Sequence, residues 1–251
     1  MTLSSSALIQ QLSRPGGVVE LQWSRPNAAN AFNEELVEEL LNALKRVATE
    51  PHLRLLVLSG AGDKFSAGFD LRDDLDDHAL AWRFSRVEQV LAIIRDFPAI
   101  TLASVVGPAF GMGADLVACC DYRLGDPTAR FRFPGPQFGV VLGTRQLALR
   151  VTNYRAMDIL LRNETVDATA ALRYGLLTEL LEAREHGRFI ESLIAGMSGV
   201  DDVTLRSLLA ILRNNDADAS MATLDRSTHR QGLGGRIELY RAKTLARKPM
   251  R

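Results

Sequence analysis

The chain has 251 residues, enough for one large domain or two small ones, and carries 30 basic and 30 acidic side chains. The zero net charge gives no broad positive field for nucleic acid or anionic lipid, and the 47% hydrophobic content excludes a disordered chain or a disulfide scaffold. No signal peptide and no apolar run of membrane-spanning length is visible. Adjacent cysteines rarely bridge, so Cys119 and Cys120 are interpreted as free thiols. We therefore expect a cytoplasmic protein without nucleic-acid or membrane partners.

The first half of the chain alternates predicted strands with predicted helices. Apolar clusters on both sides of Pro15-Gly16-Gly17 predict a hairpin, and Asn33 is placed to cap a helix that ends near residue 50. Further strands are predicted over 53–59, 100–106 and 122–125, and further helices over 79–96 and 111–120. This alternation indicates an α/β fold of ββα units around parallel strands.

From Thr144 onward the pattern is almost wholly helical. Helical periodicity is found in four stretches, 156–161, 168–172, 185–197 and 203–212. The polar, Gly-rich segment 223–235 predicts a loop. We accordingly divide the chain into an α/β core, residues 1–190, and a helical C-terminal region, residues 191–251.

Several common catalytic motifs are missing from the sequence. It has no G-x-x-x-x-G-K-[ST] loop, no H-E-x-x-H pair, no C-x-x-C spacing and no G-x-S-x-G elbow. Gly111-Met112-Gly113 lacks the third glycine of a dinucleotide-binding fingerprint. These absences argue against phosphoryl transfer, zinc hydrolysis and nicotinamide binding, and no metal site is predicted.

Two loops that follow predicted strands are the main candidates for chemistry. They are residues 64–71 (KFSAGFDL) and 107–116 (GPAFGMGADL). The second loop opens a helix, where free N–H groups and the helix dipole favour negative charge. Together the loops can present two backbone donors to one developing oxyanion. Spacing alone leaves open the alternative that the glycines only permit tight turns.

The two loops resemble the motifs A-G-x-D-L and G-x-A-x-G-x-G-x-x-L. Other matching pieces occur in order: R-P-x-x-x-N-A at 25–31, C-D at 120–121, A-x-F…P…G at 129–139, A-x-x-G-L-V within 167–177 and R-x-P at 247–249. The set resembles the crotonase superfamily, the enoyl-CoA hydratase/isomerase family. The resemblance covers residues 8–182 well and the tail weakly.

This resemblance implies a fold of ββα spirals with a helical C-terminal region that mediates trimerisation, as a homotrimer or a dimer of trimers. It implies an acyl-CoA thioester substrate, no prosthetic group, and coenzyme A only as part of the substrate. By position, the backbone N–H groups of Phe69 and Met112 would hold the thioester oxygen. Five further residues would line the CoA path: Asn27, Ala28, Ala67, Asp70 and Leu71. Arg72 and the basic tail over 243–251 are candidate phosphate contacts.

The sequence departs from the family pattern where the typical hydratases have two catalytic glutamates. Asp115 stands at the first of these positions, three residues after Met112, and Gly135 stands at the second, after Pro134. The loop over 139–144 is also about three residues shorter than usual. Asp115 is therefore the candidate general base or water-orienting group, or else only a favourable charge in a first helical turn. The remaining polar candidates are His78, Arg132, Gln137 and Arg145.

The leading prediction is an acyl-CoA-processing enzyme of the hydratase/isomerase type that stabilises a thioester enolate with two amides. Two alternatives remain open. A thioester hydrolase or a decarboxylase needs the oxyanion hole but not two glutamates. The second alternative is a CoA-ester-binding protein with little catalytic activity.

Overall fold

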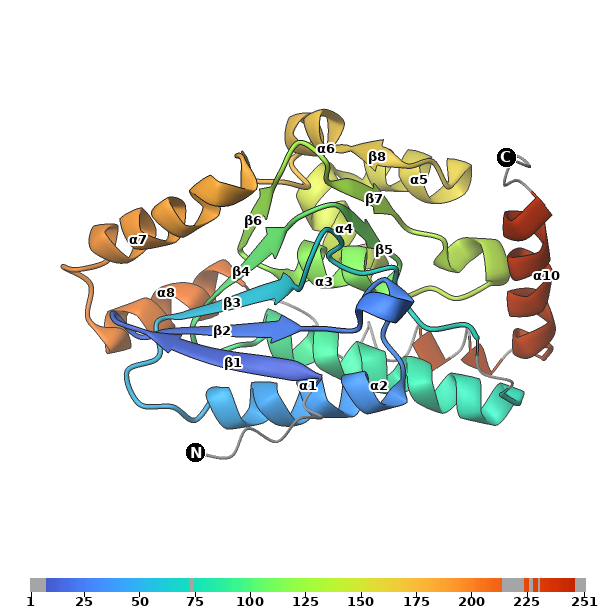
Figure 1. The fold of residues 1–251 in the computed structure, drawn as a ribbon, viewed down its shortest axis with the longest axis horizontal. Coiled ribbons are helices and arrows are strands. Elements are labelled where there is room, and N and C mark those ends of the chain that lie inside the picture. The colour runs from blue at the N-terminus through green and yellow to red at the C-terminus, as the bar shows by residue number, and fades with distance from the viewer. Residues whose placement is uncertain (1–7, 73–74, 214–223, 226–227, 230, 247–251) are drawn as a thin grey trace.

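A computed structural model describes residues 8–72, 75–213, 224–225, 228–229 and 231–246 of the chain (Figure 1). Its main sheet has the strand order β1-β2-β3-β4-β6-β9. These strands are β1 Ile9–Arg14, β2 Val18–Trp23, β3 Leu55–Gly60, β4 Ile100–Val105, β6 Tyr122–Gly125 and β9 Glu179–Leu180. β1 and β2 form the predicted antiparallel hairpin, and every other neighbouring pair is parallel. The predicted α/β fold class is confirmed.

A second, smaller sheet lies beyond the end of β4. It has the order β5-β7-β8, with β5 Pro108–Phe110, β7 Arg130–Arg132 and β8 Val166–Asp167. β5 leads directly into the second candidate loop, and β7 leads toward Gly135. This small sheet therefore positions one wall of the candidate site.

Alternating residues of the main sheet face two different hydrophobic clusters. Leu56 and Leu58 of β3 pack in the cluster that contains the first helices, whereas Leu55 and Val57 pack against the later helices. The first cluster includes the helices α1 Glu34–Val47, α2 Asp77–Arg95 and α3 Met112–Cys119 as well as later helices up to residue 174, and the second includes α7 His186–Gly196 and α8 Asp202–Leu212. Because side chains alternate along a strand, both faces of the sheet are covered.

The start of α1 agrees with its sequence signals. The Asn33 side chain accepts a hydrogen bond from the Leu36 amide at 3.1 Å, and Glu34 and Glu35 lie in the first turn. The cap satisfies one of the free amides at the helix start, and the acidic residues complement the helix dipole.

After Thr144 the described residues are mostly helical, as predicted, apart from the short strands β8 and β9. The remaining elements are α4 Thr144–Val151, α5 Asn153–Arg162, α6 Ala168–Tyr174, α10 Leu233–Ala246, and the short helices η1 Pro26–Ala28, η2 Gly135–Phe138 and η3 Ala183–Glu185. The boundary predicted near residue 190 falls within α7, and the division of the chain there stays a prediction.

The loop predicted over 223–235 is wrong, because Leu224, Asp225 and Thr228 are helical and α10 begins at Leu233. Leu233 and Ile237 are buried in a cluster with Phe84 and Phe138, so tertiary packing outweighs the two glycines that follow Leu233. α10 thereby lies beside η2, far away in sequence (Figure 1).

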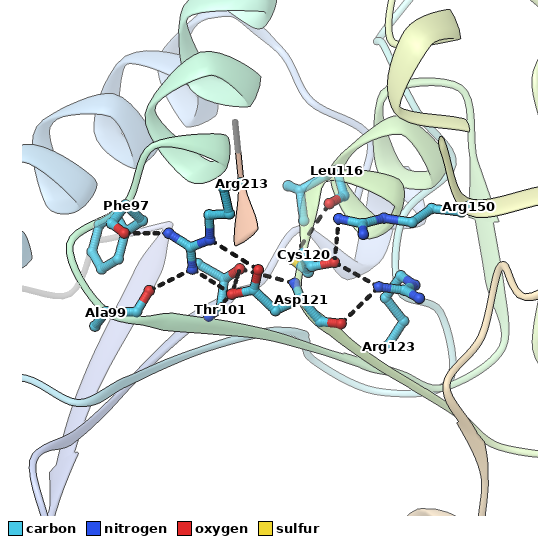
Figure 2. Close-up of polar contacts among 9 residues, drawn as sticks. All are labelled: Phe97, Ala99, Thr101, Leu116, Cys120, Asp121, Arg123, Arg150 and Arg213. Carbon is cyan, nitrogen blue, oxygen red and sulfur yellow. Dashed lines mark hydrogen bonds and ion pairs between the residues drawn. The ribbon is translucent and has the colours of Figure 1, made fainter. Parts of the chain in front are cut away.

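Asp121 joins the end of α8 to the core, and its neighbour Cys120 is held by two other arginines, as Figure 2 shows. Arg213, just after α8, donates from Nε to the Asp121 carboxylate at 2.9 Å and from Nη2 to the Ala99 carbonyl at 2.7 Å. The Cys120 carbonyl accepts from Arg123 at 2.8 Å and from Arg150 at 3.1 Å. Burial raises the pKa of the Cys120 thiol to about 12, so this cysteine stays an unreactive thiol.

Candidate active site

The two candidate loops lie in direct contact. The Ser66 amide donates to the Pro108 carbonyl, and the Phe110 amide donates to the Ser66 carbonyl, both at 2.9 Å. Gly68 has a φ of +95°, and a Cβ atom added there would lie 2.7 Å from the Phe110 carbonyl oxygen. Only glycine permits this backbone conformation and this approach, so the sequence spacing reflects contact between the loops.

The residues that carry the two predicted donor amides line the same pocket. Phe69 and Met112 both line a pocket of about 270 Å³. Met112 is the first residue of α3, where the backbone N–H has no carbonyl partner within the helix. Over the described residues, neither amide donates a hydrogen bond within the protein. Two unused N–H groups in one pocket are what an oxyanion-binding site requires.

Aromatic rings form much of the wall of this pocket. Phe69 stacks on Phe84 with ring centroids 4.6 Å apart, and Phe84 stacks on Phe138 at 6.4 Å. Tyr240 of α10 lies 5.3 Å from Phe138 and also lines the pocket. An apolar wall of this kind is suited to the hydrocarbon part of an acyl group.

Asp115 is the carboxyl group of this pocket. It lies one turn into α3, is 6% exposed, and lines the pocket together with Phe69 and Met112. Its carboxylate accepts no hydrogen bond from any described residue, and it packs directly against Gly143, where an added Cβ would lie 2.3 Å from Oδ1. Burial, reinforced by the negative charge of Glu88, raises the pKa of Asp115 well above its usual value.

The position of the second family glutamate provides no acid or base. Gly135 lines the pocket at the start of η2, and a Cβ there would lie 2.9 Å from the Val140 carbonyl oxygen. Arg132 also lines the pocket, but its Nε donates to Asn163, at 3.1 Å to the side-chain oxygen. His78 and Gln137 are exposed. Of the polar candidates, only Arg132 joins Asp115 at this pocket.

The residues predicted along the CoA path lie near the first loop. Ala67 and Leu71 line the pocket, and the Ala67 amide donates to the Ala29 carbonyl at 2.9 Å, which brings η1 with Asn27 and Ala28 beside the loop. Their contact with coenzyme A stays a prediction. The side chains predicted as a basic tail, over 243–251, lie outside the part of the chain described here.

Asp70 is buried in an arrangement that the sequence did not reveal. Its carboxylate accepts hydrogen bonds from Arg72 at 2.6 and 2.8 Å and from Arg25 at 3.1 Å. The Arg72 hydrogen bonds, together with the one from Arg25, hold the pKa of this carboxyl well below its usual range. Arg25, at the N-cap of η1, thus ties the first loop to η1. Arg72, a candidate phosphate contact, is engaged with Asp70 two residues away.

Two residues that sequence reasoning missed lie close to Asp115. They are Gly143, which contacts its carboxylate, and Glu88 of α2, whose charge acts on it. Glu88 is 2% exposed and pairs with Arg95 at 2.8 Å. The sequence signal that could have revealed this pair is a glutamate and an arginine seven residues apart on the apolar face of one helix.

The described residues contain neither a metal-binding cluster nor a membrane-spanning helix. No group of three or more His, Cys, Asp or Glu side chains among them is arranged to hold a metal ion. Within the same ranges, no helix combines the length and apolar character needed to cross a membrane.

Comparison with known proteins agrees with this geometry. Residues 13–220 match the model of the family described as enoyl-CoA hydratase/isomerase. The echA6 protein of Mycobacterium leprae, which bears an enoyl-CoA hydratase name, is 31% identical over 67% of this chain and 70% of its own length. The 2,3-dehydroadipyl-CoA hydratase of Escherichia coli is 28% identical over 85% of each chain. A solved structure of an enoyl-CoA hydratase/isomerase family protein from Bordetella parapertussis superposes with a TM-score of 0.90, at 35% identity, over 94% of this chain and 99% of that one.

The chain therefore belongs to the enoyl-CoA hydratase/isomerase family, within the crotonase superfamily, and is an enzyme of that family. The fold and family that the motifs predicted are confirmed.

Proposed function

We propose that this enzyme acts on acyl-CoA thioesters by stabilising an enolate at the thioester oxygen, and that it adds water to 2-enoyl-CoA substrates. The observation that carries the proposal is the pair of unused amides, Phe69 and Met112, which line one pocket with the Asp115 carboxyl. As water attacks the β-carbon, negative charge builds on the thioester oxygen. Fixed N–H donors stabilise that charge without reorganising.

Asp115 is the proposed proton-transfer group. It is the carboxyl group that lines the pocket with the two amides, and Gly135 supplies no second one. One carboxyl is sufficient for hydration, because it can accept a proton from water and deliver a proton to the α-carbon. Proposed contacts for the CoA moiety are Asn27, Ala28, Ala67, Asp70 and Leu71.

A second candidate function follows from the glycine at position 135. A thioester hydrolase or a decarboxylase uses the oxyanion hole and does not require two carboxylates. The apolar wall near Gly135 is compatible with either reaction.

The deciding experiment incubates the purified protein with crotonyl-CoA, butyryl-CoA and malonyl-CoA, and identifies the products by mass spectrometry. A 3-hydroxy product from crotonyl-CoA, lost in Asp115→Ala, is the expected result. Free CoA would instead indicate hydrolysis, and acetyl-CoA from malonyl-CoA would indicate decarboxylation. Binding without a product would indicate a CoA-ester-binding protein, and failure to bind any ester would overturn the proposal.

We further propose that the chain assembles as a homotrimer or a dimer of trimers. Helices α5 and α8 carry exposed apolar side chains, among them Leu161 at 69% and Leu212 at 78% exposure. Apolar patches on helices of one chain favour burial against another chain. Light scattering after size-exclusion chromatography is expected to give three or six chain masses, and a stable monomer would contradict this assembly.

A further inference from the structure

A buried ion pair lies behind the active-site carboxyl. Glu88 and Arg95 are two turns apart on α2, and Nη1 of Arg95 lies 2.8 Å from Oε1 of Glu88. Both side chains are 2% exposed. Two such charges are tolerated in an apolar interior only as a hydrogen-bonded pair, because each alone would be costly to desolvate.

This pair belongs to the same buried cluster as Asp115. Helix α2 packs against α3, which carries Asp115 and, one turn later, Cys119. Glu88 and Arg95 line one cavity together with Gly143, and Gly143 packs against the Asp115 carboxyl. The charge of Glu88 adds to burial in raising the pKa of Asp115 and of Cys119. For both groups burial is the larger cause of a pKa well above the ordinary value.

The charges around Asp115 do not balance if both acids are ionised. The guanidinium of Arg95 is hydrogen-bonded to Glu88, not to Asp115. On α4, Arg150 donates to the Ala118 and Cys120 carbonyls at the far end of α3, and Arg145 is exposed. On β7, Arg132 donates to Asn163. Arg145 lines the cavity that Glu88 and Arg95 border, but Arg95 is the cation hydrogen-bonded within this cluster. With two carboxyl groups and one hydrogen-bonded cation, one carboxyl is better accommodated in its neutral form.

The surroundings decide which carboxyl is neutral. Glu88 has the guanidinium of Arg95 and borders a second cavity of about 550 Å³, lined also by Thr144, Gln146 and Asn153. Asp115 has no hydrogen-bonding partner among the described residues and lies in the wall of the apolar pocket. The negative charge is therefore better accommodated on Glu88, and the proton on Asp115.

We propose that Glu88 is a positioning residue that keeps Asp115 in its protonated, uncharged form, so that Asp115 enters the reaction as a proton donor. The protonation state is a property of the free protein, whereas its use in hydration rests on the proposed function. In that step, the Asp115 hydroxyl gives its proton to the α-carbon while the oxygen of water bonds to the β-carbon. The carbon–carbon π bond breaks, and the water proton passes to the other carboxyl oxygen. Asp115 ends as it began, protonated.

The test is infrared spectroscopy of the ligand-free protein. The difference spectrum between the wild type and Asp115→Asn isolates the Asp115 carboxyl, and we expect a protonated C=O band that persists at about pH 7. In Glu88→Gln, which keeps the shape and removes the charge, the pH at which this band disappears should fall by about one unit or more. The alkaline limb of the kcat/KM profile should move in the same direction.

Glu38→Gln is the matched control. Glu38 lies on α1 and pairs with Arg86, which is on α2 like Glu88. The charge of Glu38 is not among the causes that raise the pKa of Asp115. This variant should leave the band unchanged. If Glu88→Gln fails to fold with Arg95 unpaired, the double variant Glu88→Gln/Arg95→Met removes the pair as a unit and should give the same shift.

Two results would overturn the inference. An ionised Asp115 at neutral pH in the wild type would contradict the protonated form. If the Asp115 carboxyl band disappears at the same pH in the wild type and in both Glu88 variants, Glu88 does not control the protonation of Asp115. Neither result depends on a substrate, so each is distinguishable from failure of the proposed hydration.

Discussion

The two sides of the candidate active-site pocket are built in different ways. One side consists of backbone, namely the amides of Phe69 and Met112. The loop that carries Phe69 pairs through Ser66 with Ala109 of β5, just before the start of α3 at Met112. The other side is side chain: Asp115 is backed by Gly143 and Glu88, which come from a loop and from a different helix.

This difference separates what the family fold provides from what the chain itself adds. The backbone side needs glycines and a helix start, and it accepts almost any side chain at the donor positions. The side-chain side varies, since one family glutamate is an aspartate here and the other is a glycine. We expect the first side to fix the class of chemistry and the second to select the reaction.

Removing the carboxyl side should have the largest effect. Asp115→Asn keeps the size of the side chain but cannot exchange a proton with substrate, so turnover should fall about 10³-fold, within the usual range for a general acid or base. Steady-state kinetics with crotonyl-CoA measure this loss. Glu38→Gln is the control, and equal losses in both variants would mean that the effect is not chemical.

Breaking the backbone side should cost about 10²-fold in turnover. In Gly68→Ala, the added Cβ meets the Phe110 carbonyl oxygen at 2.7 Å, so the two loops must separate and the amides no longer converge. Gly62→Ala is the matched control, because Gly62 also has a positive φ but nothing lies within 4 Å of an added Cβ. A folded Gly68→Ala enzyme with full activity would contradict the two-amide site.

Weakening the hydrogen bonds that Asp70 makes with Arg25 and Arg72 should lower the stability of the fold. Asp70→Asn should lower the free energy of unfolding at neutral pH by on the order of 1–3 kcal/mol, since its carboxylate bonds two guanidinium groups. The folded pKa of Asp70 lies below the unfolded one, so this stabilisation is present above about pH 4 and disappears as the pH falls further. Urea titrations of both proteins at several pH values should therefore converge in acid. Asp63→Asn, at an exposed site in the same loop, should leave stability unchanged.

Opening the aromatic wall should have the smallest effect. Tyr240→Ala removes a ring next to Phe138, so the pocket widens and longer acyl chains should gain a few-fold in kcat/KM relative to short ones. Tyr154→Ala, at a side chain that is 74% exposed, should leave the ratio as it is. If Tyr240→Ala leaves the ratio of kcat/KM for long and short acyl chains unchanged, α10 does not line the part of the pocket that binds the acyl chain.

The contact between the two loops and the candidate carboxyl Asp115 were predictable from the sequence, whereas the residues behind Asp115 were not. Gly68 and Gly111 are local signals, because each permits a backbone conformation that its own loop requires. Asp115 followed from the family resemblance, because it stands at the position of the first family glutamate, three residues after Met112. Glu88 is 27 residues earlier than Asp115 in the sequence and approaches it only because α2 packs on α3. The contact with Gly143 depends likewise on where a loop passes the end of a helix.

The fold shows the same contrast between local and long-range signals. Periodicity and capping predicted the parallel strands and the helices through Cys119. The first residues of α10 were predicted to be part of a loop, because Gly234 and Gly235 disfavour a helix locally. Leu233 and Ile237 nevertheless form helix by packing beside Phe84 and Phe138, which are remote in sequence.

A crystal structure with bound butyryl-CoA, which cannot be hydrated, tests the central claim most directly. The account predicts that the thioester oxygen lies about 2.7–3.1 Å from the amide nitrogens of both Phe69 and Met112, with the Asp115 carboxyl beside the α- and β-carbons. A thioester oxygen that contacts neither amide, with the acyl chain outside the pocket, would contradict it.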